Sequence, residues 1–141
     1  MYRARRRLLS VFLFLTLSCG GDDDPFSPTV QEVAGSYQAS SLTGTQSGIT
    51  VNLLSLGATV AVVLSEDGTT TGRVFAPGLD EGGQDLDVDL AGTWTLQGET
   101  VTFDQTGNSF IRDIPFTVGL NRLQGEGTFN TFTVSLTLTK E

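Results

Sequence analysis

The sequence contains no histidine and only one cysteine, Cys19, among its 141 residues. Histidine is the commonest general base and the commonest transition-metal ligand, so its absence argues against both kinds of chemistry. Serine and threonine are plentiful, but no imidazole is present to activate their hydroxyl groups as nucleophiles. A single cysteine forms no disulfide within the chain. We therefore predict a protein that is not an enzyme and that has no catalytic residues, no cofactor and no metal site.

Basic residues are also scarce, and half of them lie at the start of the chain. Four of the eight basic residues fall within residues 1–7, whereas none of the sixteen acidic residues falls within residues 1–18. Removal of residues 1–18 would therefore leave a net charge of −12. A surface of this sign repels phosphate backbones and anionic headgroups. Nucleic acid is consequently not an expected partner.

The chain lacks an apolar run long enough to span a membrane. Its basic start is followed by residues 8–17, which are apolar apart from Ser10 and Thr16. This run is about half of the roughly 20 residues that a spanning helix needs. A basic head, a short apolar run and the small residue Ser18 before a cleavage point are typical of a secretory signal peptide. We assign residues 1–18 to such a signal.

The segment that ends at Cys19 reads Leu-Thr-Leu-Ser-Cys and resembles the lipobox of bacterial lipoproteins. The resemblance implies that Cys19 carries acyl chains such as palmitate and that the membrane is a partner of the protein. Residues 19–29 are rich in glycine and aspartate and predict a flexible acidic tether. Gly20 directly follows the cysteine, which favours the outer membrane of the cell envelope and leaves the leaflet open. A soluble secreted protein with an unpaired Cys19 is the alternative.

Residues 30–141 form one domain by length and carry no helical pattern, so we expect the domain to contain no helix. Instead, apolar and polar residues alternate in short runs, and 17 glycines interrupt the chain. Eight to ten short strands with short connections predict an antiparallel up-and-down meander. Such a meander buries its apolar face best by closing into a small barrel, which also removes free strand edges. A sandwich of two sheets is the competing all-β architecture.

The clearest local pattern lies in residues 91–104, where two alternating runs meet at Gly98-Glu99. A two-residue turn there places Trp94 opposite Phe103 and Leu96 opposite Val101, with threonines paired on the other face. Glycine at the first turn position suits a type II′ turn, because this position has a positive φ. We predict a hairpin with one buried face and one face in water.

Other runs are assigned in the same way. Strands are expected at residues 33–39, 49–56, 59–64, 69–76, 85–90, 110–114, 116–120 and 131–139, with loops at residues 40–48 and 79–84 and a bend at residues 125–127. Residues 59–64 are nearly all apolar, which predicts a strand covered on both faces or one at a packed bend. Glu66-Asp67-Gly68 predicts a hairpin turn with a loop of two or three residues, and Asn121-Arg122 predicts a tight turn with Leu120 opposite Leu123.

Several of these motifs resemble lipocalin-like domains of bacterial lipoproteins. The motifs are Val33-Ala34-Gly35-Ser36-Tyr37, Glu66-Asp67-Gly68-Thr69, Gly92-Thr93-Trp94-Thr95-Leu96, Glu99-Thr100-Val101-Thr102-Phe103 and the closing run from Phe132 to Leu138. The resemblance implies a lipocalin-like β-barrel over residues 30–141 that binds or shields a small apolar ligand. A tightly filled barrel that acts as a structural or adaptor lipoprotein through protein contacts is equally compatible with it.

Five aromatic residues are candidates for the wall of a ligand pocket, and the alternative is that they fill the core: Tyr37, Trp94, Phe103, Phe116 and Phe132. Asp85, Asp87 and Asp89 resemble the start of a calcium loop. An EF-hand needs glycine at the sixth position and glutamate at the twelfth, where this chain has Leu90 and Leu96. We therefore interpret the three aspartates as the water-facing side of a strand.

Overall fold

The computed structural model describes residues 26–141, so the predicted signal peptide and Cys19 lie outside the described residues. The described chain forms the strands β1 (Gly35–Gln46), β2 (Ile49–Asn52), β3 (Thr59–Leu64), β4 (Thr69–Ala76), β5 (Leu86–Gln97), β6 (Thr100–Gln105), β7 (Phe116–Gly119), β8 (Arg122–Phe129) and β9 (Phe132–Lys140). A short helix, α1 (Val30–Val33), precedes β1, and three more short helical segments join later strands: η1 (Leu54–Leu56), η2 (Glu81–Gly83) and α2 (Phe110–Asp113). None of the helices among these residues has the length and apolar character needed to span a bilayer.

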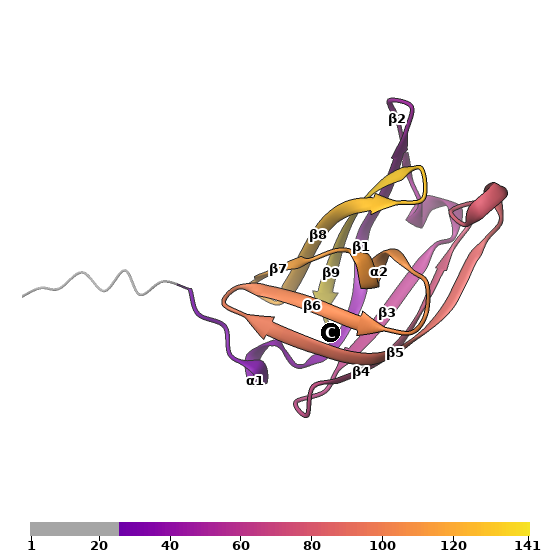
Figure 1. The fold of residues 1–141 in the computed structure, drawn as a ribbon. Helices are drawn as coiled ribbons and strands as arrows, with labels where there is room; N and C mark the ends of the chain where they lie inside the picture. The colour runs from indigo at the N-terminus through magenta and orange to yellow at the C-terminus, as the bar shows by residue number, and fades with distance from the viewer. Residues whose placement is uncertain (1–25) are drawn as a thin grey trace, which may run out of the picture.

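Eight of the strands form a closed antiparallel barrel (Figure 1). Each strand from β3 to β9 pairs with the next one along the chain, and β1 closes the ring because it pairs with both β3 and β9. The ninth strand, β2, pairs only with the second half of β1 and extends beyond the ring. The predicted all-β meander that closes into a small barrel is therefore confirmed, in place of the sandwich.

The predicted hairpin between β5 and β6 is confirmed residue by residue. Trp94 pairs with Phe103 and Leu96 pairs with Val101, and Gly98 in the turn has a φ of +60°. The strand β5 is longer than predicted, because the run before the hairpin continues into it without a break. Inward and outward residues alternate along the whole of β5. The run before the hairpin and the first arm of the hairpin therefore form one continuous strand.

In the other strands of the ring too, buried residues alternate with exposed ones, and the buried residues contribute to the core of the barrel. In β3, Val60, Val62 and Leu64 are buried whereas Ala61 and Val63 face water. The prediction that this strand is covered on both faces was therefore wrong. Inward side chains of β4, β6, β8 and β9 complete the same core, among them Val74, Val101, Leu123, Leu136 and Leu138.

Two predicted irregular regions are strand. Residues 40–48 were expected to form a loop, but β1 continues to Gln46 after a bulge between Ala39 and Ser41. Residues 125–127 were expected to bend, but they lie within β8 and pair with β9. In both regions the pairing across the closed ring outweighs the low strand propensity of glycine, since interior strands gain hydrogen bonds on both sides.

The expectation that the domain has no helix was wrong, and α2 is the clearest exception. Residues 110–114 were predicted as a strand, yet Phe110–Asp113 form a short helix with Phe110 and Ile111 fully buried. The strands β6 and β7 share only two residue pairs, so the wall is short at this point. The helix covers the gap between β6 and β8, and the Phe110 ring lies edge-on to Phe129 at 6.1 Å.

Turn positions also differ from prediction in two places. Val118 pairs with Leu123, so the β7–β8 turn consists of Leu120 and Asn121 and the side chain of Leu120 is exposed. The predicted pairing of Leu120 with Leu123 was wrong. Residues 54–56, expected to continue a strand, form η1. The hairpin between β3 and β4 has the three-residue loop Glu66-Asp67-Gly68, in which Gly68 has a φ of +86°.

Candidate functional site

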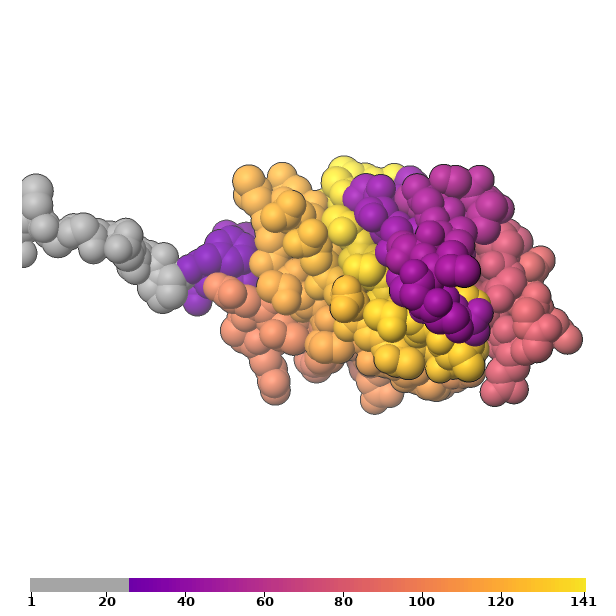
Figure 2. Space-filling model, turned by 90° about the horizontal axis from the view of Figure 1, so that it is seen from above, coloured from indigo at the N-terminus to yellow at the C-terminus, as the bar shows by residue number. Residues whose placement is uncertain are grey.

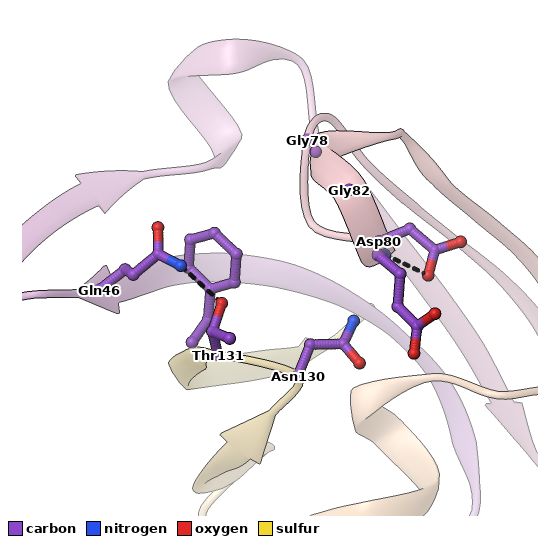
Figure 3. Close-up of a pocket in the computed structure, with 9 residues that line it drawn as sticks. Gln46, Gly78, Asp80, Gly82, Asn130 and Thr131 are labelled. Atoms are coloured by element: carbon purple, nitrogen blue, oxygen red, sulfur yellow. Dashed lines mark hydrogen bonds between the residues drawn. The ribbon is translucent and has the colours of Figure 1, made fainter.

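A pocket of about 460 Å³ lies at the end of the barrel where β1 ends (Figure 3). Three segments form it: the end of β1, the β4–β5 connection and the β8–β9 turn. Its lining residues are Gln46, Gly78, Asp80, Glu81, Gly82, Gly83, Asn130, Thr131 and Phe132. The volume falls in the range of roughly 300–1,000 Å³ that is usual for sites of small molecules.

Asn130 fixes one side of this pocket. It lies in the turn between β8 and β9 with a φ of +53°, a conformation that asparagine tolerates better than most residues. Its Nδ2 donates a 3.2 Å hydrogen bond to the carbonyl oxygen of Leu79, which ties the turn to the β4–β5 connection. A carbonyl oxygen only accepts, so the amide nitrogen must face Leu79. The oxygen Oδ1 of the same amide accepts no hydrogen bond from residues 26–141 and is an acceptor that faces outward from this contact.

The β4–β5 connection presents carboxylate groups on the opposite side. The backbone N–H of Gly78 donates to Asp85 at 3.0 Å, and that of Glu81 donates to Asp80 Oδ1 at 2.8 Å. These bonds, with the 2.9 Å backbone bond from Asp80 to Gln84, hold the connection in a compact loop. The charged residues among those that line the pocket, Asp80 and Glu81, are both acidic, so its electrostatic potential is negative.

The third side of the pocket contains the Gln46 amide and the Phe132 ring. Gln46 at the end of β1 donates through Nε2 to the Thr131 hydroxyl, and Figure 3 shows these two side chains across the pocket from Asp80. Phe132, the half-buried first residue of β9, supplies an apolar wall. The pocket thus combines one aromatic face with several hydrogen-bond acceptors. Such a site suits a small guest that has an apolar body and N–H donors or a positive charge.

The structure separates the five aromatic residues that were predicted as candidate pocket wall. Phe132 lines this pocket and Tyr37 lines a second one, whereas Trp94, Phe103 and Phe116 line neither and are buried in the barrel. The rings of Phe103 and Phe116 meet edge to face at 5.6 Å, as packed aromatic pairs do. The role of the five residues in ligand binding stays a prediction.

The second pocket, of about 230 Å³, lies at the other end of β1. It is lined by Phe26, Pro28, Glu32, Val33, Tyr37, Val118, Gly119, Leu120 and Asn121. The Tyr37 hydroxyl donates a 2.6 Å hydrogen bond to the carbonyl oxygen of Val33, which joins β1 to the end of α1. Burial raises the pKa of the Tyr37 phenol above its ordinary value.

The acidic run at the start of β5 behaves as the water-facing side of a strand. Asp87 and Asp89 are exposed on β5, and Asp85 accepts the hydrogen bond from Gly78. Arg73 on β4 donates two 2.8 Å hydrogen bonds to Asp87, and these bonds lower the pKa of that carboxyl group. Among residues 26–141, no three His, Cys, Asp or Glu side chains are grouped closely enough to hold a metal ion.

The residues that shape the larger pocket were missed by the sequence analysis, apart from Phe132. Gln46 was placed in a loop, and the β4–β5 connection was treated only as an exposed link. The turn Asn130-Thr131 between two alternating runs was the one available signal. Comparison of the chain with family models, with curated proteins and with solved structures gives no match.

Proposed function

We propose that this chain is a lipid-anchored, non-enzymatic protein of the cell envelope that binds a small molecule in the pocket beside Phe132. The observation that carries the proposal is the pocket itself, which is large enough for a small ligand and offers an aromatic wall. The anchor rests on the lipobox-like segment that ends at Cys19, and the outer membrane is the membrane that Gly20 favours. Nothing in the chain supplies a general base of the histidine type.

The guest we expect has an apolar part and a cationic or donor-rich part. Burial of its apolar part against Phe132 supplies the favourable free energy of binding. Asp80, Glu81 and the Oδ1 atom of Asn130 supply acceptors for its donors. This extends the expectation of an apolar ligand, because a guest without donors would leave these polar groups partly desolvated and unpaired.

Two probes of equal size and opposite charge test the proposal. Phenethylammonium and 3-phenylpropionate are titrated into the processed full chain in micelles, and binding is followed by isothermal calorimetry. The ammonium probe is expected to bind, and Phe132→Leu and Asp80→Asn are each expected to weaken it by about tenfold, or 1.4 kcal/mol. Thr102→Ala, on the outer face of β6, is the control and leaves binding unchanged. Binding of neither probe, together with no small molecule carried by the purified protein, would contradict the proposal.

A second candidate is an adaptor protein with a filled barrel. It is favoured by the packed Phe103–Phe116 pair and by the free edge of β2, where Ile49 is 68% exposed. A free strand edge with apolar side chains can bind an extended peptide of another protein as an added strand. Crosslinking in the intact envelope tests this function. A crosslinked complex that Ile49→Lys abolishes, with probe binding unaffected, would support it over the first candidate.

A further inference from the structure

We propose that the barrel end opposite the ligand pocket docks on the surface of the bilayer. This docking end comprises the exposed apolar residues Phe26, Val30 and Leu120 and the basic residues Arg122 and Lys140. The inference rests on the lipid attachment proposed above, and it adds an orientation of the barrel that the attachment alone does not determine.

The first observation is the exposure of large apolar side chains at this end. Leu120 is 83% exposed at the tip of the β7–β8 turn, a position that usually carries glycine, asparagine or another polar residue. Phe26 is 51% exposed and lines the same pocket as Leu120, and Val30 on α1 is 41% exposed. Grouped apolar side chains on a surface mark a place of contact with a partner or a membrane.

The second observation concerns charge. Of the four basic residues in the described chain, Arg73 and Arg112 form ion pairs with Asp87 and Asp113. The other two form no ion pair with a described carboxylate, and both lie at the docking end, where the Lys140 ammonium donates a 2.8 Å hydrogen bond to the carbonyl oxygen of Glu32. Arg122 follows the β7–β8 turn directly, and the backbone N–H of Lys140 donates to Asn121 in that turn at 2.8 Å. Basic side chains beside apolar ones are typical of surfaces that contact phospholipid headgroups.

Carboxylate groups near the docking end determine which headgroup charge the surface can contact favourably. Glu99 and Glu141 lie there, since their backbone groups bond to Val118 and Ser36. The Glu32 carboxylate accepts the backbone N–H of Thr29 at 2.8 Å and so serves as part of a helix cap. The β3–β4 turn at the same end adds Glu66 and Asp67, so acidic groups outnumber the two basic ones, and the surface fits zwitterionic phospholipids such as phosphatidylethanolamine better than strongly anionic ones.

The third observation is where the described chain begins. Cys19 precedes Phe26 by seven residues, which span at most about 25 Å when extended. The docking end therefore lies within reach of the bilayer that an acylated Cys19 would enter. Figure 2 shows the indigo start of the described chain against the orange segment that contains the β7–β8 turn. Docking would strengthen the attachment of the protein to the membrane, because apolar side chains buried in the bilayer add to the binding free energy of the acyl chains.

Docking would place the ligand pocket on the side away from the membrane. Tyr37 near the start of β1 lines the second pocket at the docking end, whereas Gln46 at the end of β1 lines the ligand pocket. The 12 residues of this strand extend over about 36 Å at 3.3 Å per residue. In Figure 1, α1 lies at one end of the barrel and β2 at the other, so the two pockets, whose lining includes Val33 and Gln46 respectively, lie at opposite ends.

Thiol labelling of the full, processed chain tests the orientation. Leu120→Cys and Ile49→Cys each introduce a thiol, the first at the docking end and the second at the far end. The proteins are inserted into phosphatidylethanolamine–phosphatidylcholine vesicles at two protein-to-lipid ratios and treated with a water-soluble maleimide. We expect the thiol from Leu120→Cys to react about tenfold more slowly than that from Ile49→Cys, which corresponds to about 1.4 kcal/mol of preference for the docked state. Unfolding in urea and detergent is expected to make both equally reactive.

The parent chain serves as the control for the anchor, because the sulfur of an acylated Cys19 does not react with maleimide. If the parent is unreactive and both introduced thiols react at the same rate, the docking inference is overturned while the anchor stands. If protection of the Leu120→Cys thiol rises with protein density, the occupant is a second copy of the chain and the inference is also overturned. If Cys19 itself reacts, the proposed anchor is wrong and docking in this form is wrong with it.

Discussion

The indole Nε1 of Trp94 donates a 2.8 Å hydrogen bond to the carbonyl oxygen of Ser65, so that a side chain of β5 holds the turn between β3 and β4. The backbone N–H of Trp94 donates to Gly68 in the same turn at 2.9 Å. The ring is only 4% exposed and belongs to the main core. One residue thus fixes a turn by hydrogen bonds and fills the barrel by packing.

Truncation of the Trp94 side chain should therefore destabilise the fold. We expect Trp94→Ala to lower the free energy of unfolding by about 3–5 kcal/mol, because it leaves a cavity in the core. Thr95→Ala is the matched control: Thr95 is exposed to water, and its hydroxyl forms a 2.8 Å hydrogen bond with the Thr102 hydroxyl. We expect it to change stability by less than about 0.5 kcal/mol. Urea denaturation measures both, and a loss below about 1 kcal/mol for Trp94→Ala would contradict the packing described.

Gly72 lies so close to the backbone of the neighbouring strand that a side chain at this position would destabilise the fold. It has a φ of +155°, and a Cβ built on it would overlap the carbonyl oxygen of Ala61 in the neighbouring strand. We expect Gly72→Ala to destabilise the barrel by about 3 kcal/mol or more, from strained backbone and from separation of β3 and β4. Gly48, with a φ of +79° and open space around its Cβ position, is the control. Gly48→Ala carries only the conformational cost of about 1–2 kcal/mol. Equal losses in thermal or urea melts would show that the contact does not matter.

The hairpin of β5 and β6 could be predicted from the sequence because two independent signals coincide there. Apolar alternation and the turn preference of Gly98 both select the pairing of Trp94 with Phe103. The run that forms β9 could be predicted for the same reason, because its apolar residues Val134, Leu136 and Leu138 alternate with polar ones and all point into the core. A one-residue shift would have put these side chains into water, so the pattern allowed one register only.

Where the sequence failed, tertiary contacts decide the local structure. The second half of β1 is a strand because β9 and β2 offer it partners on both sides, which local composition does not reveal. Residues 110–113 are helical at the point where the β6–β7 wall is short, and the helix buries Phe110 and Ile111 there. The pocket beside Phe132 joins three segments that are distant in sequence, and only the closed ring brings Gln46 beside Thr131.

Two buried polar residues, Thr70 and Gln105, lie on either side of Gly92 in the barrel wall and offer a test of interior packing. Thr70, Gly92 and Gln105 are successive partners across β4, β5 and β6. Gln105 is 4% exposed, and neither its amide nitrogen nor its amide oxygen has a hydrogen-bond partner among the described residues. An unpaired buried polar group costs about 1–3 kcal/mol.

We therefore expect Gln105→Leu to raise the free energy of unfolding by about 1–3 kcal/mol, because leucine has nearly the right size and no polar atom to desolvate. Gln97→Leu, at the exposed end of β5, is the control and should change stability by less than about 0.5 kcal/mol. Chemical denaturation gives both values. A less stable Gln105→Leu protein would show that the amide has a partner inside the barrel in solution.

Acid should weaken the fold through two exposed aspartates. The hydroxyl and backbone N–H of Thr69 donate to Asp67 at 2.6 and 2.9 Å and lower the pKa of Asp67, as the hydrogen bonds from Arg73 lower the pKa of Asp87. Both groups release their proton more readily in the folded chain than in the unfolded one. Their stabilising effect is therefore complete above the unfolded pKa of about 3.9 and is lost as the pH falls through the folded pKa values.

We expect stability to decline as the pH is lowered from about 5 to about 2, with a shallower decline in Asp67→Asn. Thr69→Val removes the hydroxyl donor and should move the pKa of Asp67 back towards its ordinary value, which a pH titration of the carboxyl carbon by NMR measures directly. An unchanged Asp67 pKa in Thr69→Val would show that the hydroxyl does not act on this group.

Native mass spectrometry of the protein purified from its own membrane tests the proposed function most directly. It reports in one spectrum the covalent mass on Cys19 and any small molecule held in the pocket. We expect a chain that begins at Cys19 with added acyl mass, and a bound guest that Phe132→Leu weakens. A bare thiol at Cys19, or a protein without a guest both as purified and after challenge with phenethylammonium, would contradict the proposed lipid-anchored binding protein.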